Sequence, residues 1–253
     1  MKALVTGASS GIGRDMARYL SSKGYDLILV GRNNQKLLEL KGELKTESRI
    51  LNADLSKKEN VFALYDEIKD EDIDMLINDA GFGVYGEFWK TDLDKETDLI
   101  GTNVIALHIL MKLVLKKMKE KDKGYILNVS SLASFSPGPL MATYYASKAY
   151  VTYISRAVSK ELKKAKSNIV VSVLCPGPVA TNFNNVAGVN FSMKPLSSEY
   201  VAKYAIDNLL KGKRTIIPGT VNKWLHFLSK ISPSSLSMET VYHNQTRKTQ
   251  VKK

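Results

Sequence analysis

Residues 2–13, KALVTGASSGIG, join a short apolar run to three glycines, and a helical pattern, RDMARYLSSKG, follows at 14–24. Gly7, Gly11 and Gly13 permit a sharp turn and a close approach of the backbone to a ligand. The free N–H groups and the positive dipole end of the following helix favour an anionic group such as a pyrophosphate. A strand, a glycine turn and a helix in this order predict a dinucleotide-binding α/β fold.

Short apolar runs alternate with longer amphipathic stretches along the rest of the chain. Strands are predicted at 2–6, 26–30, 49–52, 73–77, 124–129, 169–174 and 214–217, and helices at 12–23, 33–46, 57–69, 93–121, 143–166 and 198–211. This order predicts a Rossmann-like, doubly wound parallel sheet of about seven strands with helices on both faces. We expect a single domain over residues 1–230 and a basic, partly disordered C-terminal tail over 231–253.

The bulk composition is that of a globular protein with a substantial core. The 253 residues are 44% hydrophobic, and the single cysteine, Cys175, lies in an apolar run that favours a buried structural thiol. No signal-peptide core follows Lys2, and no run approaches the length of a membrane span. A cytoplasmic location is therefore expected.

Positive charge is concentrated near the C-terminus. Of the net charge of +12, two thirds lies in residues 211–253. This segment contains nine Lys/Arg and one acid, Glu239. A solvated tail, a membrane surface, nucleic acid and an acidic substrate carrier are all compatible with this charge, although no nucleic-acid motif accompanies it. An apolar stripe comprises Val221, Trp224, Leu225, Leu228 and Ile231. We expect it to pack on the domain or a second subunit, with contact to a membrane surface as the less favoured alternative.

The second predicted strand ends in DLILVGRN, residues 26–33. Folds that bind NAD carry an acid here for the ribose hydroxyl, whereas this chain has Arg32. An arginine can grip a 2′-phosphate bidentately, so the sequence favours NADP(H) over NAD. A plain surface role is the alternative for Arg32, and Arg14 is a second candidate for the same phosphate.

Residues 143–157, TYYASKAYVTYISRA, contain four tyrosines and one lysine. Only Tyr144 lies four residues from Lys148 on the predicted helix, and residues four apart share a helix face. A phenol with a pKa of about 10 donates protons poorly near neutrality. We expect a nearby ammonium to lower the pKa of Tyr144. Tyr145, Tyr150 and Tyr153 are then packing residues.

From Lys2 to about Thr181 the chain resembles the short-chain dehydrogenase/reductase family, in its short single-domain branch. The resemblance lies in TGxxxGIG at 6–13, Asp54-Leu55, NDAG at 78–81, Asn103, Ser131, the Tyr144/Lys148 pair and PGPVxT at 176–181. It implies catalytic roles for Asn103, Ser131, Tyr144 and Lys148. It implies cofactor contacts from Gly7, Ser9, Ser10, Gly11, Ile12, Gly13, Arg32, Asp54, Leu55, Asn78, Ala80, Gly81, Tyr144, Lys148, Pro176, Gly177, Val179 and Thr181.

The resemblance also implies individual roles. Tyr144 would act as acid/base, Lys148 would bond the nicotinamide ribose, Ser131 would polarise the substrate carbonyl, and Asn103 would hold a water that relays protons. Ser130 and Ser134 are rivals of Ser131, but the family's gap of thirteen residues to the tyrosine selects Ser131. His108, His226 and His243 lack metal-ligand or triad spacing, so no metal is expected.

The sequence departs from the family pattern in two places. The family usually has Asn where this chain has Asp79, and an ionised carboxylate cannot donate a hydrogen bond. After Lys211 the chain does not match the usual final strand and tail. A homodimer or homotetramer is implied by the resemblance alone.

These features predict an NADPH-dependent oxidoreductase that reduces a ketone, ketosteroid or 3-oxoacyl group to an alcohol, or catalyses the reverse. The expected apolar pocket wall comprises Phe82, Tyr85, Phe88, Trp89, Leu132, Phe135 and Met141, with residues 182–196, which include Gly188, as a lid. The alternative is a non-catalytic NADP-binding sensor or scaffold that acts through its basic tail.

Overall fold

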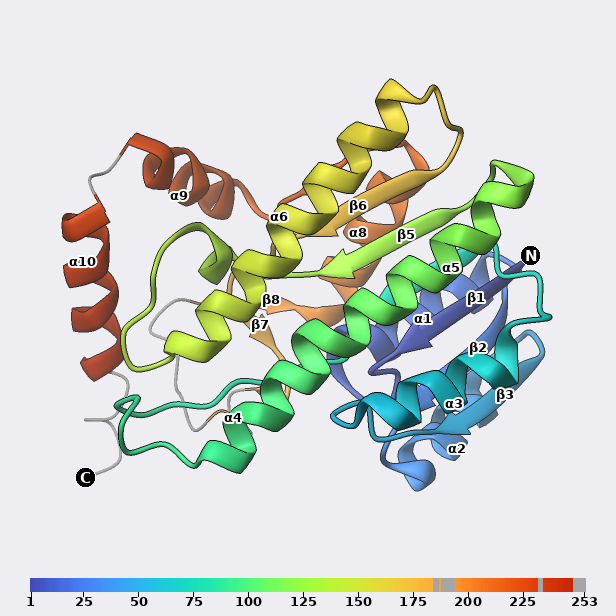
Figure 1. Ribbon diagram of the computed structural model, residues 1–253, viewed down its shortest axis with the longest axis horizontal. Helices are drawn as coiled ribbons and strands as arrows, with labels where there is room; N and C mark the ends of the chain where they lie inside the picture. Colours follow the sequence, from blue (N-terminus) through green and yellow to red (C-terminus); the bar gives the residue numbers. More distant parts are fainter. Residues whose placement is uncertain (184–186, 188–193, 232–233, 248–253) are drawn as a thin grey trace.

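The computed structural model describes residues 1–183, 187, 194–231 and 234–247. Its centre is a seven-stranded sheet of order β3-β2-β1-β4-β5-β6-β9, with every neighbouring pair parallel (Figure 1). The strands are β1 (Lys2–Thr6), β2 (Asp26–Gly31), β3 (Ser48–Asn52), β4 (Met75–Asn78), β5 (Tyr125–Val129), β6 (Val170–Leu174) and β9 (Thr215–Ile216). The predicted doubly wound sheet is confirmed.

Helices cover both faces of the sheet. One face is covered by α1 (Gly11–Ser22), α2 (Asn34–Glu43) and α8 (Ser198–Leu210), and the other by α3 (Lys58–Ile68), α5 (Leu107–Lys121) and α6 (Ala142–Lys164). Along β1, Ala3 and Val5 pack in the first core and Leu4 packs in the second. Because successive strand side chains point to opposite faces, a strand covered on both sides is apolar throughout.

The single helix predicted at 93–121 is three consecutive elements. A π-helical turn, η1 (Gly101–Ala106), separates α4 (Leu93–Ile100) from α5. The combined segment is long and apolar enough to cross a bilayer by length and composition, but Leu110 and Met111 of α5 are buried in the core beside α3. A Cβ on Gly101 would lie 2.2 Å from the Ser56 carbonyl oxygen, so only glycine fits this close approach.

The C-terminal half contains elements that we did not predict. They are η2 (Leu132–Phe135), the short parallel pair β7 (Val179–Ala180) and β8 (Leu196–Ser197), α9 (Thr220–Ile231) and α10 (Ser234–Arg247). Helix α10 lies in the tail that we expected to be partly disordered, and 248–253 are outside the described residues. Most of the expected lid, 184–186 and 188–193, also lies outside them. The boundary at residue 230 remains a prediction.

Candidate active site

A cavity of about 590 Å³ opens at the carboxyl ends of the strands. This is where open parallel α/β sheets bind ligands. Its wall contains most of the predicted site residues: Gly7, Ser9, Ser10, Gly11, Ile12, Arg32, Asp54, Leu55, Ala80, Gly81, Ser131, Tyr144, Lys148, Pro176, Gly177, Val179 and Thr181. Three predicted residues, Gly13, Asn78 and Asn103, are not part of this wall, and their roles stay predictions.

The glycine turn fits a dinucleotide because side chains cannot occupy it. Gly7 has φ +71°, and a Cβ there would lie 2.8 Å from the Ala80 nitrogen. Gly11, at φ +57°, faces the cavity at the first turn of α1. A Cβ on Gly13 would lie 2.6 Å from Asp79 Oδ2, so glycine at this position allows α1 to pack closely on the strands.

Arg32 and Asn33 line the cavity at the end of β2. The Arg32 carbonyl oxygen accepts a hydrogen bond from Asn52 Nδ2 at 3.1 Å, and the Asn33 side chain caps α2 by accepting from the Lys36 N–H at 3.0 Å. The backbone here is therefore held in place independently of the Arg32 side chain. Within the described residues, the Arg32 guanidinium forms no ion pair.

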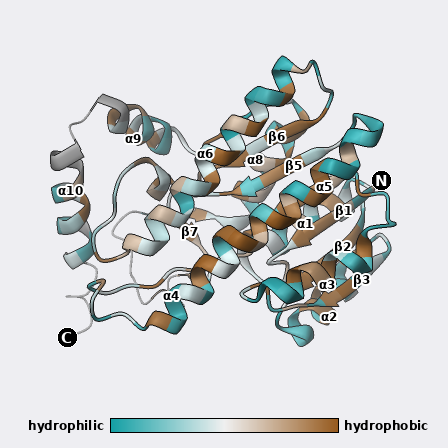
Figure 2. Cartoon of the chain, viewed as in Figure 1, coloured by the Kyte–Doolittle hydropathy of each residue, from teal (hydrophilic) through white to brown (hydrophobic). Residues whose placement is uncertain are grey.

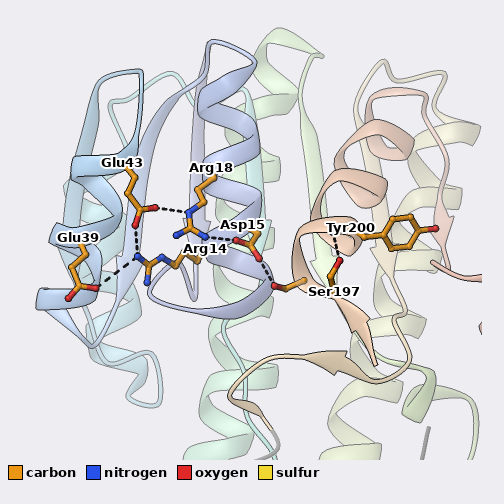
Figure 3. Close-up of polar contacts among 8 residues, drawn as sticks. Arg14, Asp15, Arg18, Glu39, Glu43, Ser197 and Tyr200 are labelled. Atoms are coloured by element: carbon orange, nitrogen blue, oxygen red, sulfur yellow. Dashed lines mark hydrogen bonds and ion pairs between the residues drawn. The ribbon is translucent and has the colours of Figure 1, made fainter. Parts of the chain in front are cut away.

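Arg14 does not join Arg32 in the cavity wall. Figure 3 shows the Arg14 guanidinium pointing to α2, where its Nη2 lies 2.7 Å from Glu43 and 4.0 Å from Glu39. Arg18 shares Glu43, and these arginines lower the pKa of that carboxyl. The idea that Arg14 assists in phosphate binding is therefore wrong for this arrangement, because its charge is already compensated.

Tyr144, Ser131 and Lys148 meet where β5 ends and α6 begins. The Ser131 hydroxyl accepts from the Ala133 N–H at 3.1 Å at the start of η2, and its interaction with the Tyr144 phenol lowers the pKa of that phenol. Lys148 Nζ donates to the Val129 carbonyl oxygen at 2.8 Å and lies 5.9 Å from the Tyr144 ring centroid. The rival Ser130 donates to the Lys148 carbonyl oxygen at 2.8 Å, so its hydroxyl is committed to α6.

The pKa of Tyr144 is raised, contrary to the sequence expectation. Burial is the largest cause, because it disfavours the phenolate, and the hydrogen bond with Ser131 only partly opposes it. The Lys148 ammonium is directed at the Val129 carbonyl oxygen and does not contact the phenol. Tyr144 is therefore protonated at neutral pH, and burial makes its phenol a weaker acid than a free one.

The charges of Asp79, which is partly buried, and of Lys148, which is buried, shift each other's pKa. Burial raises the pKa of Asp79, and the charge of Lys148 and the Gly13 N–H oppose that shift. Burial lowers the pKa of Lys148, and Asp79 opposes that shift in turn. The carboxyl group that stands where the family usually has Asn thus favours the charged form of the lysine.

Asn103 and Asn78 act as structural braces. Asn103 Oδ1 accepts from the Phe82 N–H at 3.1 Å, and its Nδ2 donates to the Phe82 carbonyl oxygen at 3.0 Å and to Ser147 Oγ at 3.1 Å. The π-helical turn around Asn103 thereby fixes the loop after β4. Asn78 Nδ2 donates to Asn128 Oδ1 at 2.9 Å between β4 and β5, inside the sheet, and its predicted cofactor contact stays a prediction.

The substrate side of the cavity includes a wall that we did not predict. Val241 and Gln245 of α10 line it, and Gln245 Nε2 donates to the Tyr145 hydroxyl at 3.1 Å. The Tyr85 hydroxyl donates to the Gln245 carbonyl oxygen at 3.2 Å. The i, i+4 spacing of Val241 and Gln245 was the only sequence signal that the two side chains share a face.

Several aromatic expectations need correction. Tyr145 packs on a hydrophobic cluster as expected and also lines the cavity, whereas Tyr150 and Tyr153 are exposed. Of the expected wall, Phe82, Leu132 and Met141 line the cavity. Phe88 and Trp89 are exposed, and Tyr85 and Phe135 are absent from the wall. The described end of the expected lid, Asn182 and Phe183, also contributes.

Comparison with known proteins agrees with this geometry. The family model for short chain dehydrogenases matches residues 1–189. A very-long-chain 3-oxoacyl-CoA reductase of Anas platyrhynchos is 36% identical over 79% of this chain and 66% of its own length. An inactive hydroxysteroid dehydrogenase-like protein 1 of Homo sapiens is 34% identical over 84% of this chain and 67% of its own length. The chain thus spans about two thirds of both relatives.

Among solved structures, a short-chain dehydrogenase from Sphingobium yanoikuyae in complex with NADPH superposes with a TM-score of 0.81. It is 28% identical and covers 88% of this chain and 90% of its own. Fold, glycine turn, catalytic-group geometry and sequence similarity agree, and the chain belongs to the short-chain dehydrogenase/reductase family of oxidoreductases.

Proposed function

We propose that this protein is an NADPH-dependent reductase that converts a hydrophobic carbonyl compound into an alcohol, with Tyr144 as the proton donor. The observation that carries the proposal is the meeting of Ser131, Tyr144 and Lys148 in one cavity beside the glycine turn. A purely binding protein has no need for a buried, protonated phenol beside a positioned hydroxyl.

The bound nicotinamide supplies the hydride in this chemistry. The Ser131 hydroxyl orients the substrate carbonyl next to the phenol, and Tyr144 gives its proton to the oxygen as negative charge develops there. Lys148 donates to the Val129 carbonyl oxygen at the floor of the site, and the charge of Asp79 favours its protonated form. Tyr144 starts in the protonated state that reduction requires, as any phenol does at neutral pH.

Arg32 supports NADPH as the preferred form of the cofactor. It lines the cavity at the position where NAD-binding folds place an acid, and its guanidinium suits a 2′-phosphate. The structural relative from Sphingobium yanoikuyae was solved with NADPH. Both observations favour a phosphorylated ribose at this end.

The substrate wall supports a mainly apolar carbonyl compound. Phe82, Met141 and Val241 line it, with the amide of Gln245 and the hydroxyl of Tyr145 as polar groups. Ketones, ketosteroids and 3-oxoacyl thioesters fit this description, and one relative is named for 3-oxoacyl-CoA reduction. A cytoplasmic location and a homo-oligomeric state are further parts of the proposal.

A non-catalytic NADP-binding role is the second candidate, because a relative of similar identity is named inactive. A panel of aliphatic ketones, ketosteroids and 3-oxoacyl thioesters, followed by the loss of NADPH absorbance, separates the two. We expect turnover with at least one class. NADPH binding without turnover across the whole panel, in both directions of reaction, would support the binding role instead.

A further inference from the structure

Helix α9 contacts the body of the protein with polar side chains. Asn222 is buried, its Nδ2 donates to the Pro218 carbonyl oxygen at 2.8 Å, and a Cβ on Gly177 would lie 2.5 Å from its Oδ1. One turn further, the His226 ring lies 3.9 Å from the Phe135 ring, centroid to centroid. Surface helices of globular proteins normally pack their apolar face inward, so this orientation is reversed.

The apolar stripe of α9 consequently faces outward. Val221, Trp224, Leu225 and Leu228 follow i, i+3, i+4, i+7 spacing and form one face of the helix. Val221 is 60% exposed, Trp224 67% and Leu228 50%. Figure 1 shows α9 and α10 at the edge of the molecule, outside the helical layers on the sheet, and Figure 2 shows hydrophobic residues along α9. Contiguous exposed apolar surface of this kind indicates an interaction site.

The charge around the stripe selects among possible partners. The helix that carries the stripe, residues 220–231, contains Lys223 and Lys230 and no acid in its sequence. Lys223, on the flank of the stripe, is exposed. A two-fold contact with a second copy would bring two equally basic segments together. An anionic bilayer offers both an apolar interior for the stripe and negative charge for its surroundings.

We propose that α9 docks this protein on the surface of an anionic phospholipid bilayer, with Trp224 and Leu228 inserted at the headgroup boundary. Helix α9 ends at Ile231 and α10 begins at Ser234. Val241 and Gln245 of α10 line the substrate side of the cavity. Docking through α9 therefore brings the bilayer close to the element that borders that cavity. The proposal does not depend on which carbonyl compound is reduced.

The test uses the full-length protein with Trp224 as its own reporter. Trp89 is the other tryptophan of the chain, so Trp89→Phe leaves Trp224 as the sole tryptophan emitter. We expect a blue shift of its emission, and co-sedimentation, with vesicles of phosphatidylcholine containing about 30% phosphatidylserine. Both signals should weaken at about 1 M salt, where the Debye length is about 3 Å.

Matched double variants separate the stripe from general hydrophobicity. Leu225→Ser/Leu228→Ser removes two exposed apolar side chains of α9, and Leu38→Ser/Phe62→Ser removes two of similar exposure on α2 and α3. We expect vesicle partitioning to fall at least about tenfold in the first variant and to stay unchanged in the second. Lys223→Glu, which leaves the stripe intact, should also weaken binding to anionic vesicles.

Absence of vesicle binding by the wild type would overturn the proposal, as would equal partitioning of the two double variants. Sedimentation velocity tests the other possible partner of the stripe, a second copy of the chain. If Leu225→Ser/Leu228→Ser converts an oligomer into a monomer and vesicles are not bound, the stripe is a subunit interface and the lipid assignment is wrong.

Discussion

Replacing Arg32 with aspartate reverses the charge at the end of the cavity where β2 stops. The substitution is expected to leave the local fold intact, because the hydrogen bond from Asn52 is to the Arg32 backbone and Asn33 caps α2 independently. The change therefore acts on the ligand. It removes the cation proposed to hold the 2′-phosphate and installs an acceptor for a ribose hydroxyl.

The expected magnitude follows from the bonds exchanged. A hydrogen bond to a charged group contributes about 1.5–3 kcal/mol, which is about 10–150-fold in affinity for NADPH. The new carboxylate adds repulsion of the phosphate and a hydrogen bond for NADH. We therefore expect the ratio of kcat/KM for NADPH to that for NADH to fall by about 100-fold or more in Arg32→Asp.

The assay is steady-state kinetics with both cofactors at a fixed carbonyl substrate. Arg14→Gln is the matched control, because Arg14 lies next to the glycine turn in the sequence but is paired with Glu43 and is not part of the cavity wall. Its cofactor ratio should remain that of the wild type. A folded Arg32→Asp variant with an unchanged ratio, or an equal shift in Arg14→Gln, would refute the reasoning.

Three further predictions concern the effect of Asp79 on Lys148, the stability of the fold in acid, and the substrate side of the cavity. Asp79→Asn removes the charge that raises the pKa of Lys148, so the alkaline limb of the kcat/KM–pH profile should move to lower pH; an unmoved limb contradicts the coupling. Bonds from Ser167 and the Asn168 N–H lower the pKa of Asp122 to about 2. Ionised Asp122 therefore stabilises the fold at pH values above its ordinary pKa. This stabilisation is lost as the pH falls through about 2. Denaturation at several pH values should show Asp122→Asn less stable than the wild type at neutral pH, with the difference vanishing in acid. Gln245→Ala removes the hydrogen bond to Tyr145, so KM for the carbonyl substrate should rise about 2–10-fold while KM for NADPH stays constant. A change confined to NADPH would place α10 at the wrong end of the cavity.

The strand and helix order was predictable because it rests on local periodicity. Apolar runs such as LILV at 27–30 form strands that are covered on both faces. The glycine turn has a strand before it and a helix after it. The choice of Tyr144 needed only helical spacing to Lys148. These features are encoded within a few residues of one another, so a single sequence reveals them.

The remaining features depend on contacts between distant segments. Arg14 was misassigned because its partners, Glu39 and Glu43, come from the next helix. The pKa of Tyr144 was predicted in the wrong direction because burial, a property of the folded protein, outweighs a charge that spacing suggested. The π-helical turn at Asn103 leaves the apolar pattern of 93–121 unchanged, and α10 has a mostly polar sequence that gave no reason to place it at the cavity.

The central claim is that the Tyr144 hydroxyl delivers the proton during carbonyl reduction. Tyr144→Phe removes that hydroxyl alone, and Tyr150→Phe is its matched control, because Tyr150 lies on the same helix with its hydroxyl 2.7 Å from His108 Nδ1. The decisive measurement is the single-turnover rate of NADPH oxidation at saturating substrate, together with the NADPH dissociation constant. The account predicts a rate about 10²–10⁴-fold slower in Tyr144→Phe, unchanged NADPH binding, and a wild-type rate in Tyr150→Phe. A near-wild-type rate in Tyr144→Phe would contradict it.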